Sequence, residues 1–206
     1  IDTLMDKKDF KLISLIEEGF DIPYSKNKIE LPDGFRGQRV WNWSTEPVGM
    51  ATFKALGVES PIQTPVPEVL PSLQTGLLNV VTASPLAAVG LQWSTQIKYV
   101  YDMNLYYDPG VVLINKSSWE KMPADLQQVF LDTRSELTDY FFQIERPDQD
   151  RALEGMLKHG AQLVKPDPAS LQVMKNKTRP VWDELADKVY PRALLDKILA
   201  AKKQWA

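Results

Sequence analysis

The sequence predicts an α/β fold, and two observations lead to this class. Segments with helical apolar spacing alternate with short apolar segments typical of strands over residues 4–119. The segment LLNVVTAS at 77–84 is almost continuously apolar, as are strands that are buried on both faces of a parallel sheet. Parallel strands are joined by right-handed crossovers, and the helices expected between the strands supply these connections.

The first predicted helix covers residues 4–19, because Leu12, Ile13 and Ile16 recur near helical spacing and Gly19 is a typical stop signal. The elements that follow are expected in the order strand 20–24, strand 38–43, helix 45–56, helix 67–73, strand 77–84, helix 85–93, strand 97–103 and strand 108–119.

The helix at 45–56 carries clear signals at both ends. Thr45 is its expected N-cap, Pro47 lies in its first turn, and Gly57 follows it directly.

The last part of the chain is predicted to be mostly helical. A long amphipathic helix is expected from Ser118, running to Glu145 or, past a break at Pro147, to His159. The remaining elements are a strand within 161–167 and helices at 168–188 and 191–205.

The composition excludes several classes of function. The chain has 24 Lys and Arg against 27 Asp and Glu, interspersed, so it lacks the basic surface that binds nucleic acid. It has no cysteine, which excludes disulfides, thiolate catalysis and a cysteine zinc site. The single histidine, His159, leaves little basis for a metal site or a Ser-His-Asp triad. We therefore expect no metal, no cofactor and no catalytic residue.

The acidic pair Glu17 and Glu18 falls on the expected first helix. Adjacent helical residues point apart, so we interpret both as surface charge rather than as a catalytic pair of carboxylates.

The sequence contains no predicted membrane span and no predicted signal peptide. No apolar run approaches the roughly 20 residues that a transmembrane helix needs. The first residues, IDTLMDKKDF, lack the cationic and apolar blocks of a signal peptide.

The stretch GQRVWNWSTEP at 37–47 places Arg39, Trp41 and Trp43 on alternate positions. Successive residues of a strand point to opposite faces, so these three side chains are expected to share one face. A tryptophan buries a large apolar area and keeps an N–H donor. This combination suits either a protein core or the wall of a small-molecule pocket.

Residues 56–85, LGVESPIQTPVPEVLPSLQTGLLNVVTASP, closely resemble the signature of the DctP-type solute-binding receptors of tripartite ATP-independent periplasmic (TRAP) transporters. The shared features are an alternating proline segment, Glu68, the LQTG motif at 73–76 and a later proline. The likeness extends to FRGQRV at 35–40, to KYV at 98–100 and to the start of the expected long helix, so it covers essentially the whole chain.

This resemblance implies a two-lobed α/β periplasmic solute-binding fold with a long lobe-spanning helix. Such a receptor closes on a small solute in the cleft between its lobes, because a ligand that touches both lobes stabilises the closed state. It then delivers the solute to the membrane permease subunits of the transporter and catalyses no reaction. Family members are longer at the N-terminus, so the resemblance also implies that the N-terminal part of lobe one is missing from this sequence.

The resemblance divides the chain into five expected segments. They are the remainder of lobe one at 1–34, the β/α core of lobe two at 35–84, crossing segments and returning strands at 85–117, the long spanning helix at 118–159, and the C-terminal strand and helices at 160–206.

The resemblance places an arginine that clamps a solute carboxylate four residues after Gly37, where this chain has Trp41. This departure puts the family's usual acids in question. Trp41 and Trp43 are compatible with stacking on an apolar or aromatic acid or on a cation. Arg39, on the same face, is the alternative clamp.

Two further ligand-binding residues follow from the resemblance. Val66 matches a position whose side chain lines the cleft, and Ser84 aligns near an amide that hydrogen-bonds the solute. Trp93 is also a candidate for the cleft, although we interpret it first as a helix end. The expected ligand-binding set is therefore Trp41, Trp43, Val66, Ser84 and Arg39.

The sequence thus predicts a periplasmic receptor for a small organic solute, an organic acid or a more apolar or aromatic compound. Two other classes stay open. A sensor or scaffold relative would present the same bound ligand to a different partner. A carbohydrate-active enzyme would use the tryptophans as sugar platforms, but it needs a positioned acid and base that the sequence does not display.

Overall fold

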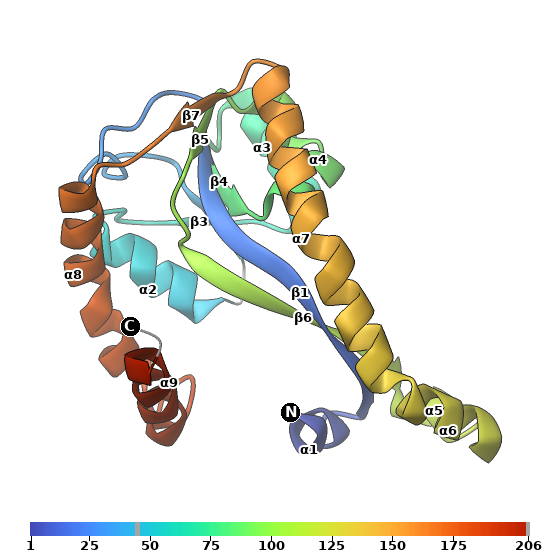
Figure 1. The fold of residues 1–206 in the computed structure, drawn as a ribbon. Helices are drawn as coiled ribbons and strands as arrows, with labels where there is room; N and C mark the ends of the chain where they lie inside the picture. Colours follow the sequence, from blue (N-terminus) through green and yellow to red (C-terminus); the bar gives the residue numbers. More distant parts are fainter. Residues whose placement is uncertain (44–45, 205–206) are drawn as a thin grey trace. The chain divides into compact units, whose positions relative to one another are not determined.

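A computed structural model describes residues 1–43 and 46–204 and confirms the α/β class (Figure 1). Its elements are α1 (Asp2–Asp6), β1 (Phe10–Ser25), β2 (Trp41–Asn42), α2 (Pro47–Ala55), β3 (Ile62–Gln63), α3 (Val66–Thr75), β4 (Val80–Ala83), α4 (Pro85–Gly90), the 3-10 helix η1 (Trp93–Gln96), β5 (Tyr99–Tyr101), β6 (Tyr106–Asn115), α5 (Lys116–Trp119), α6 (Ala124–Asp132), α7 (Arg134–Lys158), β7 (Gln162–Val164), α8 (Pro168–Leu185) and α9 (Arg192–Gln204).

The described chain forms two compact units, each assembled from segments that are distant in sequence. The first unit contains Ile1–Ile22, Ala83–Val89 and Asn104–His159. The second contains Pro23–Thr82, Gly90–Met103 and the described residues from Gly160 onward. The boundary falls inside β1, so this strand contributes residues to both units.

The first unit is built on a long antiparallel ribbon of β1 and β6 (Figure 1). β-bulges interrupt the pairing between Leu12 and Ser14 and again between Glu17 and Gly19. A bulge leaves an extra residue on one strand and shifts the alternation of its side chains. Buried and exposed residues therefore follow one another irregularly along β1.

The predicted helix at 4–19 is wrong for most of its length, because α1 ends at Asp6 and β1 begins at Phe10. The first bulge places consecutive buried residues at 12–14, which removes the two-residue period that identifies a strand. Gly19 has a φ of 88° and lies in the second bulge instead of ending a helix. The strand predicted at 20–24 is confirmed as the end of β1.

Helix α7 supplies hydrogen-bond donors to backbone carbonyls at both bulges. The guanidinium of Arg134 donates to the carbonyl oxygens of Leu12 at 2.9 Å and Ile13 at 3.2 Å. Farther along the helix, Nε2 of Gln149 donates to the carbonyl oxygen of Glu18 at 3.0 Å. Carbonyls that lose a ladder partner need another donor, and α7 provides it.

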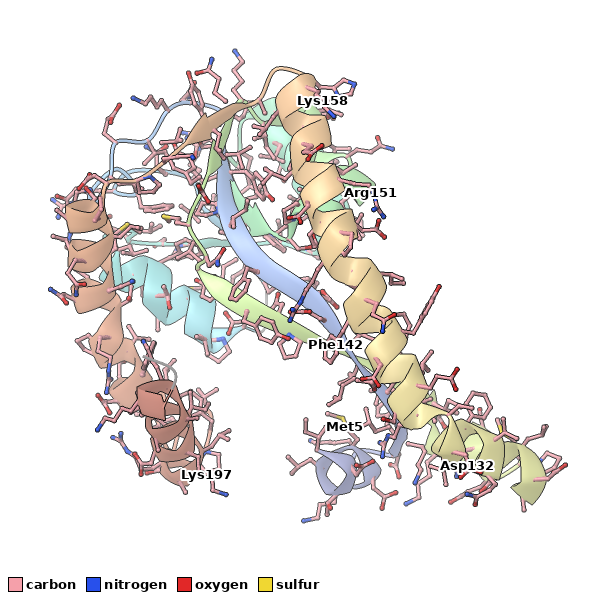
Figure 2. All side chains as sticks on the ribbon, viewed as in Figure 1. Met5, Asp132, Phe142, Arg151, Lys158 and Lys197 are labelled. Carbon is pink, nitrogen blue, oxygen red and sulfur yellow. The ribbon has the colours of Figure 1, made fainter. Side chains whose placement is uncertain are left out.

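The long helix expected from Ser118 is divided into α5, α6 and α7, with Thr133 between the last two. The predicted break at Pro147 is absent, and α7 continues to Lys158, which Figure 2 labels at its end. Proline removes one backbone donor from the helix. Most side chains of α7 are partly or fully exposed, so water can reach the carbonyl left without a partner.

In the second unit the end of β1 pairs antiparallel with β5, and β5 pairs in parallel with β7. β4 is the neighbour of β1 in the same sheet, and β2 pairs in parallel with β3. Every residue of β4 is buried, as the apolar run at 77–84 predicted. The core of this unit is rich in large side chains, including Tyr24, Phe35, Phe53, Leu73 and Trp93.

Helix α2 begins at Pro47, two residues later than the predicted start at 45, with Glu46 as its N-cap and Pro47 in its first turn as predicted. The carboxylate of Glu46 accepts hydrogen bonds from the backbone N–H groups of Val48 and Gly49. The predicted cap Thr45 lies outside the described residues.

The other predicted elements are present with shifted bounds. Helix α3 ends at Gly76, whose φ of 80° is the left-handed conformation expected of a glycine stop signal. The predicted helix at 85–93 is the shorter α4, followed by η1. The last predicted helix is α9, described to Gln204, and its predicted final residue Trp205 lies beyond the described range.

Within residues 1–43 and 46–204, no helix combines the length and the apolar character needed to span a membrane.

Candidate functional site

The candidate site is a cluster of the tryptophans Trp41, Trp43 and Trp93 in the second unit. The ring centroids of Trp41 and Trp43 are 5.4 Å apart, and those of Trp41 and Trp93 are 5.0 Å apart in an edge-to-face arrangement. Trp41 and Trp93 are each 1% exposed, whereas Trp43 is 52% exposed. Trp41 is therefore the central ring, with one neighbour inside the protein and one at the surface.

Strand pairing fixes the position of Trp41. Its backbone lies opposite Ile62 in the parallel pair of β2 and β3. Its indole Nε1 donates to the carbonyl oxygen of Thr64, just after β3, at 2.9 Å. The N–H of Trp41 is therefore already bonded and is not a free donor for a ligand.

Trp93 begins η1 and follows Gln92, which has a φ of 60°. Its Nε1 is buried, and no described residue accepts a hydrogen bond from it. A buried donor without a partner is rare in native proteins and costs about 1–3 kcal/mol. Trp93 is thus a member of the site that the sequence indicated only weakly, as a residue beside an expected crossing segment.

Arg39 is exposed, and its side chain hydrogen-bonds to a backbone carbonyl. Its Nε donates to the carbonyl oxygen of Gly76 at 2.7 Å, and its backbone N–H donates to Oδ1 of Asn79 at 2.8 Å. Nδ2 of Asn79 donates to the side chain of Gln38 at 2.9 Å. Asn79 therefore anchors the segment that leads into β2.

The remaining predicted site residues occupy helix starts. Val66 is the first residue of α3 and is half-buried, two positions after Thr64. Ser84 is buried and belongs to the first unit, so the structure does not bring it together with the tryptophan cluster within one unit. Its hydroxyl accepts a hydrogen bond from the N–H of Ala87 at 3.3 Å and so caps α4.

Gly49→Ala is expected to destabilise the chain by about 1–3 kcal/mol through overpacking beside the tryptophans. A Cβ at this position would press on Oδ1 of Asn42 and on a carboxylate oxygen of Glu46. Nδ2 of Asn42 also donates to the carbonyl oxygens of Trp43 and Glu46, so the amide is not free to move away. Urea unfolding measures the change. Gly90→Ala is the control, since a Cβ there meets open space, and equal losses in both variants would contradict this packing.

A second group of polar residues lies in the first unit, and it corrects the interpretation of Glu17 as surface charge. Glu17 lies on a strand, is only 4% exposed and accepts a hydrogen bond from Nε of Arg146 at 2.8 Å. The side chain of Glu17 is therefore a buried anchor for α7.

Among the carboxyl groups of these polar residues, Asp21 has the most strongly shifted pKa. Its side chain is buried, at 7% exposed. Burial, together with the negative charges of Asp108 and Glu18, raises the pKa of Asp21 to about 7. Burial also raises the pKa of Asp108. An acidic residue inside the apolar run FDIPY was the sequence signal for this site, and sequence reasoning missed it.

The described residues contain no group of three or more histidine, aspartate or glutamate side chains arranged to hold a metal ion.

The fold matches solved structures of solute receptors. DctP7, a Bordetella pertussis extracytoplasmic solute receptor binding pyroglutamic acid, has a TM-score of 0.82 at 19% sequence identity, covering 91% of this chain and 61% of that one. A TRAP periplasmic solute-binding protein from Haemophilus influenzae with bound L-gulonate has a TM-score of 0.84 at 21% sequence identity. This match also covers 91% of this chain and 61% of that one. The fold is therefore that of a periplasmic-type solute receptor.

The sequence comparison identifies the family. Residues 1–188 match the family model of DctP, the bacterial extracellular solute-binding proteins of family 7, and the chain belongs to this family. The resemblance seen in residues 56–85 is thereby confirmed. The C4-dicarboxylate-binding periplasmic protein DctP of Rhodobacter capsulatus is 26% identical over 190 residues, which are 90% of this chain and 55% of that protein.

The family comprises extracellular solute-binding receptors, found in the periplasm, and not enzymes. This chain spans about half the length of the curated relatives that it matches.

Proposed function

We propose that this chain belongs to an extracytoplasmic receptor that binds a small organic acid and delivers it to the permease subunits of a TRAP transporter. The observation that carries the proposal is the family match over residues 1–188, together with a buried aromatic cluster centred on Trp41. The resemblance implies a solute-clamping arginine where this chain has Trp41, which supports a role of the cluster in holding the solute.

The choice of an acid rests on the solutes named for similar proteins. The Rhodobacter capsulatus relative is named for C4-dicarboxylates, and the two solved structures hold pyroglutamic acid and L-gulonate. A tryptophan ring provides apolar contact area and no positive charge. We therefore propose that the acid recognised by this chain has a larger apolar or aromatic part than a C4-dicarboxylate.

Ligand-binding roles for Trp43, Val66, Ser84 and Arg39 belong to the same proposal. Trp43 offers a half-exposed ring next to Trp41. The Nε of Arg39 already donates to the carbonyl oxygen of Gly76, which holds the guanidinium in place and makes Arg39 the weaker candidate.

Native mass spectrometry of gently purified protein is expected to reveal a bound small molecule at one copy per chain. Denaturation then releases the molecule for identification, and a carboxylic acid supports the proposal. Thermal-shift measurements with the same acid are expected to show stabilisation, because a ligand that binds only the folded state raises the melting temperature. A chain that carries no small molecule and is stabilised by no organic acid would contradict the proposed function, and turnover of a carbohydrate would favour the enzyme alternative.

A further inference from the structure

We propose that the indole N–H of Trp93 donates a hydrogen bond to the bound solute, and that the solute group meeting the tryptophan cluster is a flat, uncharged ring with one hydrogen-bond acceptor. This inference rests on the proposed function and refines it, since it names the part of the organic acid that this cluster recognises.

The first argument is the unpartnered donor. Trp93 is 1% exposed, and its Nε1 has no acceptor among the described residues. Folding has removed this N–H from bulk water without a protein acceptor in exchange, which is unfavourable. Such a group is expected to have a partner from outside the chain, and a solute acceptor beside the tryptophan cluster meets that need.

The second argument is that the neighbouring polar groups are already engaged. The N–H of Trp41 is held by the carbonyl oxygen of Thr64, and the amide of Asn42 donates to the backbone oxygens of Trp43 and Glu46. Of the two buried indoles of the cluster, Trp93 is therefore the one whose N–H is left for a ligand.

The third argument concerns charge. Within the described part of the chain, the contacts between cationic groups and tryptophan rings involve Trp119 and Trp182, and none involves the cluster. A single neutral N–H cannot compensate a buried carboxylate, which needs several donors or a cation. A carbonyl oxygen or a ring nitrogen is satisfied by one N–H. The acceptor near Trp93 is therefore an uncharged group, and the carboxylate of the solute is bound elsewhere.

The fourth argument is shape. The buried ring of Trp41 lies between two other indoles at 5.0 and 5.4 Å, and its own N–H is occupied. Aromatic faces favour flat partners that stack in offset or edge-to-face contact. A planar ring therefore fits this cluster better than an extended aliphatic chain.

Matched pairs of acids test both parts of the inference. Pyroglutamic acid has a ring carbonyl that cyclopentanecarboxylic acid lacks, and nicotinic acid has a ring nitrogen that benzoic acid lacks. L-Malate serves as an acyclic acid. Affinities for the 206-residue chain are measured by calorimetry. The indole N–H signals are followed in nitrogen-15 correlation spectra, in which Trp93→Phe identifies the Trp93 signal by its loss.

The expected result is that an acid with a ring acceptor binds more tightly than its matched partner and shifts the Trp93 N–H signal. Trp93→Phe keeps an aromatic ring but removes the donor, so it is expected to weaken the binding of that acid about tenfold or more and to change the binding of its matched partner by less than about twofold. Trp182→Phe, on α8 outside the cluster, is the control and is expected to leave both affinities unchanged. If Trp93→Phe does not fold, the Trp93 signal is instead assigned by three-dimensional NMR of the unmodified chain, whose spectra then report on the donor.

Three outcomes would overturn the inference. The first is that an acid with a ring carbonyl or ring nitrogen binds without shifting the Trp93 N–H signal and binds Trp93→Phe with the same affinity. This result would mean that the N–H donates to an internal water instead. Tight binding of L-malate with no binding of any ring acid would exclude a flat ring. Both of these results leave the proposed receptor function standing. Failure of every acid to bind would instead count against the receptor function and, with it, against this inference.

Discussion

Asp21→Asn is expected to raise the melting temperature of the chain above pH 7 and to change it little below pH 4. Asp21 is buried, and its pKa in the folded chain is raised from 3.8 to about 7. Between these two pH values the folded state holds a proton that the unfolded state has lost, so stability falls as the pH rises. Above pH 7 the folded state contains a buried, ionised carboxylate near Asp108 and Glu18. Asparagine removes that charge.

The size of the stabilisation by Asp21→Asn is set by the shift in the pKa of Asp21 between the unfolded and the folded chain. Each pKa unit corresponds to about 1.4 kcal/mol, so the gain at high pH is of the order of 4 kcal/mol, or roughly 10 °C in melting temperature for a chain of this length. Thermal unfolding at a series of pH values from 3 to 9 measures it. Asp139→Asn removes an exposed carboxylate from α7 and is the control. Parallel pH profiles for the Asp21→Asn variant and the unmodified chain would contradict the prediction.

Trp41→Ala is expected to destabilise the chain by about 3–5 kcal/mol and to weaken solute binding more than about tenfold. The side chain is 1% exposed and contacts two other indole rings, so its loss leaves a large cavity. It also leaves the carbonyl oxygen of Thr64 without its donor. Denaturant unfolding and calorimetry measure the two effects separately.

Trp41→Phe distinguishes the structural role of Trp41 from its role in binding. Phenylalanine fills most of the cavity but cannot donate to Thr64, so stability should fall by only about 1–2 kcal/mol. Affinity should be largely retained if the ring face is what the solute contacts. A variant that is stable but has lost binding would instead show that the full indole is needed, and unchanged affinity in Trp41→Ala would assign Trp41 to the core alone.

The parts of the fold that sequence reasoning predicted are those with a clear local signal. β4 was predicted because a strand buried on both faces is apolar throughout. Helix α3 was predicted because Gly76 provides the left-handed residue at its end. The first part of β1 was missed because its two bulges replace the two-residue alternation with a pattern that happens to fit helical spacing.

The candidate site was predicted only in the part that has a local sequence signal. Alternation along the strand placed Trp41 and Trp43 on one face, and their rings are in contact. Trp93 joins them from a segment about 50 residues away, through tertiary packing that no local pattern contains. The raised pKa of Asp21 likewise depends on its burial in the folded chain and on Asp108, a residue on the neighbouring strand β6.

The hydrogen bonds from α7 to β1 determine how the ribbon of the first unit can pair. A two-stranded ribbon is marginally stable alone, and its strands can slip past each other by one residue. Arg134 and Gln149 each contact one particular bulge, so a slip of β1 would break both sets of hydrogen bonds at once. Helix α7 thus helps to set the register between β1 and β6. The residues that do so lie more than 100 positions after β1 in the sequence.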